Sequence, residues 1–287
     1  MGRIPTRTNT IHSSRAQWRW PWRAATAILL TLALAAGASG VSGHQRKQTK
    51  KKPAPAPPAP AVVPFGAGER LEYAAQWNKF VTAATLQLSV VERRDFFGRP
   101  AWHFQAMAQT IDPVRMLYQI DDQFDSYTDA TTLECRQYEM YLREQAKKEN
   151  LVVPMATKPD PSRSGTHIYM VLAGTQDPVG ALYRLRAHDW AKEPAVRVPV
   201  FDGRKLYELD ARRESEGLPI TVAAGNFVVR RINVRVLLGG QEVPNLKLWL
   251  SLAQDPAETP VLIEAEAPFG TVRAELTARG PKPAAGD

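Results

Sequence analysis

From Phe65 onward, the chain consists of short segments in which apolar and polar side chains alternate. In residues 83–92, Leu86, Leu88 and Val90 share one face, and polar residues occupy the positions between them. Successive side chains of a strand point to opposite sides, so a period of two is typical of a strand with one buried face. The chain from Phe65 is therefore expected to fold mainly as antiparallel sheet.

The same alternation returns along the chain, and turn-forming residues separate the segments. It is found in residues 100–110, 196–201, 205–212, 228–236, 246–250 and 272–276. Asp202-Gly203 lies between two of these segments and predicts a hairpin, because these residues tolerate the positive φ angles of tight turns. A second turn is expected at Phe269-Gly270. We predict one large curved antiparallel sheet or open half-barrel of about ten to twelve strands.

Helix signals are confined to two short segments. In residues 177–186, Asp177 can cap a helix, Pro178 suits its first position, and apolar residues recur at helical spacing. A shorter helical turn is expected in residues 112–118. The predicted fold class is therefore mainly β, with one or two short helices.

The positive charge of the chain is concentrated at its N-terminus. The formal net charge is +8, but residues 1–64 hold ten basic residues and no acidic one, which leaves 27 basic against 29 acidic residues in the remainder. The part of the chain that can form a core is therefore close to neutral. A nucleic-acid ligand, which would require a basic patch on the domain, is not expected.

Residues 24–38 form a run of apolar and small side chains behind five arginines. This is the arrangement of a secretory signal, and Ala36-Gly37-Ala38 fits the small-residue rule for cleavage. We expect residues 1–43 to be a signal peptide that directs the protein to the periplasm. The alternative is an uncleaved anchor in the inner membrane through residues 24–43, although about 20 apolar residues are normally needed to cross a bilayer.

Three further boundaries follow from composition. Residues 44–64 are rich in lysine and then in alternating proline and alanine, which predicts a disordered, extended linker. Residues 65–279 are expected to form a single β-rich domain. Residues 280–287 are expected to be a disordered tail.

Residues that could support catalysis or bind a metal are dispersed along the predicted domain. His103, His167 and His188 are far apart in the sequence and do not have the spacing of a metal site. The single cysteine, Cys135, rules out a disulfide within the chain and is expected to be a buried core residue. Four aspartates within residues 121–129 lack the glycine and the distal glutamate of a calcium loop. We predict no catalytic residue, no metal site and no cofactor.

Aromatic side chains are the remaining candidates for a binding site. They come from many predicted strands and could line the concave face of a curved sheet, although ordinary core packing is the alternative for each of them. The candidate ligand-binding residues are Trp77, Trp102, Phe104, Tyr118, Phe124, Tyr183, Phe201 and Trp249.

Six segments, taken in order, resemble a known bacterial family. They read GERLEYAAQWN, GRPAWHFQAMAQT, YQIDDQFDSYTDATTLECRQYE, GTQDPVGALYRLR, VPVFDGRKLYEL and PVLIEAEAPFGTVRAELT. Over residues 65–277 they are similar to the exported family catalogued as domain of unknown function 3108. The resemblance implies export in a Gram-negative bacterium and a fold like the half-barrel of lipoprotein carriers. It implies no activity and no catalytic residue, because the family has none assigned.

A large curved sheet has an inner face that must be covered by its own helix, by a partner or by an apolar ligand. We therefore expect a non-enzymatic periplasmic envelope protein that binds or carries a lipid or another apolar ligand. The first alternative is a structural or interaction module that docks another envelope protein. An envelope hydrolase is the second alternative, and it requires a histidine beside a carboxylate in a cleft. Membrane contact is expected only through the N-terminal segment, if it remains uncleaved.

Overall fold

The protein is described from a computed structural model. The structure describes residues 62–78, 81–145, 147–163, 165, 167–268 and 270–280. The predicted signal peptide, most of the predicted linker and nearly all of the predicted tail lie outside these residues, as does Phe269 in the second predicted turn. Among the described residues, no helix combines the length and the apolar character that crossing a membrane requires.

The described chain forms one open sheet of fourteen strands, which confirms the predicted fold class. The strands are β1 (Arg70–Trp77), β2 (Val81–Asp95), β3 (Pro100–Thr110), β4 (Asp121–Asp129), β5 (Cys135–Glu144), β6 (Lys147–Ala156), β7 (Tyr169–Met170), β8 (Ala195–Phe201), β9 (Leu206–Val222), β10 (Gly225–Leu238), β11 (Gln241–Glu242), β12 (Lys247–Ala253), β13 (Pro260–Ala267) and β14 (Gly270–Arg279). Their order in space is β7-β6-β5-β4-β3-β2-β1-β14-β13-β12-β10-β9-β8, with β11 paired to β10. The count exceeds the ten to twelve expected, since β7 and β11 have two residues each and are too short to show alternation.

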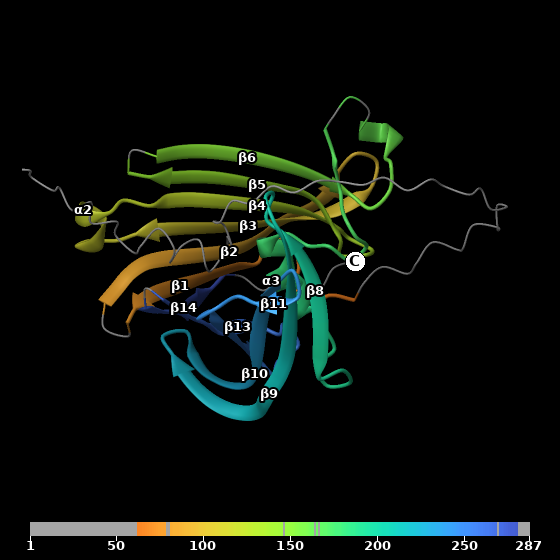
Figure 1. Cartoon of the computed structure of the whole chain (residues 1–287). Helices are drawn as coiled ribbons and strands as arrows, with labels where there is room; N and C mark the ends of the chain where they lie inside the picture. Colours follow the sequence, from red (N-terminus) through yellow and green to blue (C-terminus); the bar gives the residue numbers. More distant parts are fainter. Residues whose placement is uncertain are drawn as a thin grey trace, which may run out of the picture.

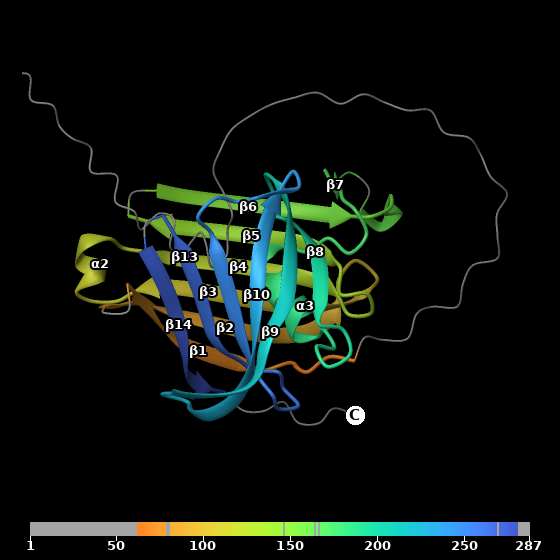
Figure 2. The ribbon, with the colours of Figure 1, turned by 60° about the horizontal axis from the view of Figure 1, so that its bottom comes forward.

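The sheet folds back on itself, so that two halves face each other (Figures 1 and 2). Strands β1–β6 lie side by side in the first half. Strands β8–β10 and β12–β14 form the second half and run across the first in Figure 2. Antiparallel pairing of β1 with β14, from Leu71 opposite Arg279 to Trp77 opposite Val272, joins the halves into one sheet.

Helix α3 (Pro178–Arg186) lies between the two halves (Figure 1). Asp177 caps it by accepting hydrogen bonds from the backbone N–H groups of Val179 and Gly180, and Pro178 occupies its first turn, as the sequence predicted. Two core clusters meet on the helix. Tyr183 packs with β1–β5 in the first cluster, and Leu185 packs with β8–β10 and β12 in the second. The protein thus covers the concave face at this position with its own helix.

The turn between β8 and β9 brings the two ends of the sheet together at one corner. Gly203 has a φ of +90°, and the Asp202 carboxylate accepts hydrogen bonds from the backbone N–H groups of Arg204 and Lys205. This geometry confirms the predicted hairpin. A Cβ at Gly203 would lie 2.7 Å from Val153 Cγ2 and 2.8 Å from Leu151 Cδ2, both on β6. Glycine therefore lets this turn contact the opposite edge of the sheet.

The remaining helical elements are short. Helix α2 (Val114–Leu117) lies within the predicted segment 112–118 and connects β3 with β4 at one end of the first half (Figure 2). A 3-10 helix, η2 (Pro161–Arg163), follows β6. Val114 is the buried residue of α2, whereas Met116 and Leu117 are exposed.

Candidate functional site

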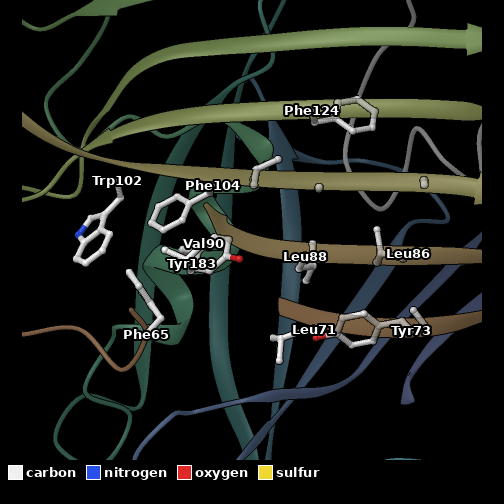
Figure 3. Close-up of a cluster of buried hydrophobic side chains, with 14 of the residues drawn as sticks. Phe65, Leu71, Tyr73, Leu86, Leu88, Val90, Trp102, Phe104, Phe124 and Tyr183 are labelled. Atoms are coloured by element: carbon white, nitrogen blue, oxygen red, sulfur yellow. The ribbon is translucent and has the colours of Figure 1, made fainter. Parts of the chain in front are cut away.

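Four aromatic rings pack together on the concave side of the first half (Figure 3). The rings of Phe104 on β3 and Tyr183 on α3 stack with their centroids 3.8 Å apart. Phe65 meets them edge-on at 5.2 and 5.1 Å, and Trp102 lies 5.7 Å from Phe65. All four residues are buried. These rings hold α3 against β3 and occupy the concave side at this end of the sheet.

A buried ion pair lies beside the rings. Arg186, at the end of α3, donates two hydrogen bonds to the carboxylate of Glu69, at 2.6 and 3.0 Å. It also donates to the backbone oxygens of Ala257 and Glu258, between β12 and β13. Burial alone lowers the pKa of Arg186, but the bonds to Glu69 outweigh this effect and raise the pKa above its ordinary value. One side chain therefore ties the helix to the start of β1 and to the second half.

Hydrogen bonds also fix the first turn of α3. The Asp177 carboxylate accepts from Ser126 Oγ on β4 at 2.5 Å as well as from the helix N–H groups. Burial raises the pKa of Asp177, and these hydrogen bonds oppose the rise. Cys135 is buried nearby, as predicted, and burial raises the pKa of its thiol well above the ordinary value. The thiolate, which is the reactive form of cysteine, is thus disfavoured.

The end of the first half that carries α2 has a different surface. Ala83 and Val114 form a small buried cluster there, and the half-buried rings of Trp77 and Tyr118 pack against it. Beyond this cluster, Met116 and Leu117 are 76% and 63% exposed. An apolar rim, composed of Met116, Leu117, Trp77 and Tyr118, therefore lies at the α2 end of the half-barrel.

The eight predicted binding residues do not form one set. Trp102, Phe104, Phe124 and Tyr183 belong to the first core cluster, and Phe201 packs against its margin. Trp77 and Tyr118 come together in the small cluster under α2. Trp249 stands apart, with the Arg231 guanidinium 5.2 Å from the centroid of its ring.

The prediction that Trp249 lines the concave face is wrong. Leu248 and Leu250 on β12 point into the second core cluster, so alternation directs Trp249 to the outer face. There it lies opposite Glu264 on β13. The alternation of leucines in residues 246–250 already predicts that Trp249 points to the face opposite the leucines. Its aromatic character alone made it a candidate for the binding site.

The outer face of the first half carries a polar cluster that the sequence did not predict. His103 Nε2 on β3 donates a hydrogen bond to Asp125 Oδ1 on β4 at 2.7 Å. The side chains of His103 and Asp125 are 12% and 4% exposed. Gln105 and Gln123 donate to the same carboxylate, and the ring of Tyr127 stacks on His103 at 4.6 Å. Burial alone raises the pKa of Asp125, but the three hydrogen bonds outweigh it and lower the pKa.

A groove of about 290 Å³ lies next to this cluster, lined by Asp121, Gln123, Tyr141 and Arg143. Tyr141 Oη donates to Glu139 Oε2 at 2.5 Å, which raises the pKa of Tyr141 to about 12. The phenol is therefore a neutral donor. Arg115 holds Asp121 at the margin of the groove with two bonds of 2.8 and 2.9 Å.

The cluster brings together residues that are distant in the sequence. His103 and Asp125 are 22 positions apart, and antiparallel pairing of β3 with β4 makes them neighbours. A usable signal was the identity of the outward residues, which are mainly amides, carboxylates and tyrosines, with Arg143 as a basic member. The hydrolase alternative requires a histidine beside a carboxylate, and His103 with Asp125 is such a pair, although the groove itself is lined by other residues. In the described part of the chain, no three His, Cys, Asp or Glu residues are grouped to hold a metal ion.

Comparison with known proteins identifies a sequence family. A family model described as "Protein of unknown function (DUF3108)" matches residues 72–277. No curated protein matches the chain.

The chain is similar to three solved structures at low sequence identity. The chain is similar to a β-barrel-like protein of domain of unknown function DUF1849 from Brucella abortus, at 11% identity and a TM-score of 0.49, covering 77% of this chain and all of that one. It is also similar to a protein from Bacteroides fragilis that is described as exported with a YmcC-like fold. The identity is 9% and the TM-score 0.36, and the match covers 78% of this chain and 100% of that one. The third is a protein from Parabacteroides distasonis that is described as a lipoprotein. The identity is 10% and the TM-score 0.34, and the match covers 76% of this chain and 99% of that one. At such low identities and TM-scores, these likenesses say nothing about ligand or activity.

Proposed function

The chain belongs to the family of unknown function DUF3108, and from this premise we propose that it is a non-enzymatic envelope protein that binds a lipid or another apolar ligand on the concave side of its sheet. The N-terminal sequence supports the location. Residues 1–43 have the composition of an export signal. A periplasmic protein with an apolar binding surface is consistent with this export signal and with the apolar rim.

The apolar rim is the observation that carries the proposal. Met116 and Leu117 are exposed side by side on α2, next to the half-buried rings of Trp77 and Tyr118. Removing a side chain of this size from water contributes about 1.5–3 kcal/mol. Methionine also adapts its shape to irregular apolar partners. A clustered rim of this kind favours an apolar ligand more strongly than isolated exposed side chains would.

The inner face next to the rim supports a binding site at the α2 end. Ala75 and Ala84 are paired across β1 and β2, and Ala108 lies opposite Leu86 across β2 and β3. Small and apolar side chains therefore make up the inner face next to the rim, where they are largely buried in the first core cluster. At the other end of the concave side, α3 and the four packed rings occupy the space (Figure 3). The ligand is accordingly expected to contact the α2 end first.

Photocrosslinking in cells tests the proposal. Benzoylphenylalanine replaces Met116 in one variant of the full chain and Met170 in a control. Met170 on β7 is also an exposed methionine, at 58%, and lies at the opposite end of the first half (Figure 2). The expected result is a lipid adduct at position 116, identified by mass spectrometry, and none at position 170.

Three outcomes of the crosslinking would overturn the lipid proposal. One dominant protein adduct at position 116 would favour the interaction module instead. Equal labelling at both positions, or no adduct at either, would mean that the rim has no specific apolar ligand.

A fluorescent fatty acid supplied to the purified full chain gives an independent measurement. Met116→Lys with Leu117→Lys should weaken its binding by about tenfold or more, and Met170→Lys with Leu172→Lys should not.

A further inference from the structure

We propose that the outer face of β3, β4 and β5 is a second binding site, whose ligand is a neutral sugar chain. The site is centred on the groove lined by Asp121, Gln123, Tyr141 and Arg143 and extends to the polar cluster of His103 and its neighbours. The three strands lie side by side in the first half (Figure 1). None of the four rim residues lines the groove, and the proposal of this site rests on other residues.

The charges on this face are arranged differently from those on the second half. On the second half, the Glu264 carboxylate forms ion pairs with Arg231 at 2.8 Å and Arg273 at 2.9 Å. On the first half, Asp125 and Glu139 lie directly opposite each other across β4 and β5. Like charges at opposite positions destabilise a sheet. The second half neutralises its carboxylate with arginines, whereas these two carboxylates face each other.

Glutamine amides, a phenol and an imidazole hold the two carboxylates in place. Glu139 accepts from Gln137 at 2.6 Å and from Tyr141 at 2.5 Å, and Asp125 accepts from two glutamines and His103. Within the described residues, neither carboxylate forms an ion pair with a lysine or an arginine. The carboxylates are thus oriented by glutamines, a tyrosine and a histidine, without a lysine or an arginine. Such an arrangement has little value for stability. Asp125 is buried beneath its donors, whereas the half-buried Gln123, Glu139 and Tyr141 present donors and acceptors to a ligand in a fixed arrangement.

The residue types fit sugar hydroxyl groups. A hydroxyl group both donates and accepts, so it can pair with carboxylate oxygens, with glutamine amides and with the Arg143 guanidinium. The half-buried ring of Tyr141 offers an apolar face on which the C–H groups of a pyranose can rest. A groove of this volume is near the lower limit of small-ligand sites, about 300 Å³. It can take one sugar unit, with the rest of the chain following the strands.

Other ligand classes fit less well. An acyl chain would leave the polar groups of the groove without partners, at a cost of about 1–3 kcal/mol for each buried group. An anionic ligand such as a phosphate could pair with Arg143 in the groove, but it would also lie near the carboxylates of Asp121, Asp125 and Glu139. A neutral polyhydroxylated ligand avoids both penalties.

Titration calorimetry with three neutral hexasaccharides tests the site. The probes are chitohexaose, cellohexaose and maltohexaose, added to the purified full chain. At least one should bind with a Kd of about 1 mM or tighter. Tyr141→Ala should weaken that binding by about tenfold or more, and Gln123→Ala should weaken it to a smaller extent.

Trp249→Ala is the matched control, because Trp249 is a half-buried aromatic residue on the outer face of the other half. It should leave sugar binding unchanged. Circular dichroism must show that each variant is folded before its affinity is compared. The proposal is overturned if no hexasaccharide binds, or if folded Tyr141→Ala binds as tightly as the original chain. Equal losses in Tyr141→Ala and Trp249→Ala would also overturn it, as would binding of phosphatidylglycerol vesicles that Tyr141→Ala abolishes.

Discussion

Replacing Arg186 with methionine should destabilise the domain by about 3–5 kcal/mol, because the change leaves the buried carboxylate of Glu69 without a cation. Arg186 is 1% exposed and Glu69 is 7% exposed. The variant loses both bonds to Glu69 and the bonds to the backbone oxygens of Ala257 and Glu258. The guanidinium also contacts the rings of Phe65 and Tyr183 at 5.5 and 5.2 Å. Most of the expected loss comes from the unpaired charge, not from the contacts themselves.

A double variant separates these contributions. Glu69→Leu with Arg186→Met removes both charges and keeps apolar volume in the same place. If the unpaired carboxylate causes the loss, the double variant should be more stable than Arg186→Met alone, by about 2 kcal/mol or more. If the hydrogen bonds to the backbone oxygens dominate, the double variant should be no more stable than the single one.

Urea unfolding at pH 7 measures these differences. Tryptophan fluorescence is a suitable signal, since Trp102 and Trp190 are buried in the folded chain. Glu266→Gln is the control, because the pair of Lys247 with Glu266 is exposed, and such pairs contribute about 1 kcal/mol or less. The reasoning is refuted if Arg186→Met costs less than about 1 kcal/mol, or if the losses of Glu69→Leu and Arg186→Met add up in the double variant.

Two further substitutions have opposite expected signs. Gly180→Ala should destabilise the domain by about 1–3 kcal/mol, because its Cβ would lie 2.9 Å from Asp177 Oδ2; an unchanged urea midpoint would contradict this. Asp122→Asn should stabilise it at pH 7. Burial raises the pKa of Asp122 to about 6, so the original chain loses stability as the pH rises from about 4 to 6 and the carboxyl ionises in the folded state. The shift corresponds to at most about 3 kcal/mol, and solvent screening reduces it to about 1–2 kcal/mol. Unfolding between pH 4 and 7 should show this slope in the original chain and a flatter profile in Asp122→Asn.

The local elements were predictable because their signals lie within a few residues. Alternation identified the long strands, and Asp177 with Pro178 marked the start of α3. Asp202-Gly203 identified the hairpin between β8 and β9. The two-residue strand β7 was not predicted, because two residues cannot show a period.

The candidate sites were predicted only in part. The aromatic residues that meet around α3 were recognised as a class, but the sequence did not separate them from Trp77 and Tyr118 under α2 or from Trp249 on the outer face. The pairing of His103 with Asp125 was not foreseen. Which residues face each other across a sheet depends on strand register, and register is set by contacts between distant segments.

By itself, the sequence determined the class of fold, the strand periodicity, the capped helix and the near neutrality of residues 65–287. These properties follow from side-chain chemistry at neighbouring positions. Only the tertiary structure decided that β1 pairs with β14, that α3 lies between the two halves, and that Glu69 meets Arg186 across 117 positions. Such contacts depend on how the two halves of the sheet fold together, because burial of the shared core selects one arrangement among many that the local pattern allows.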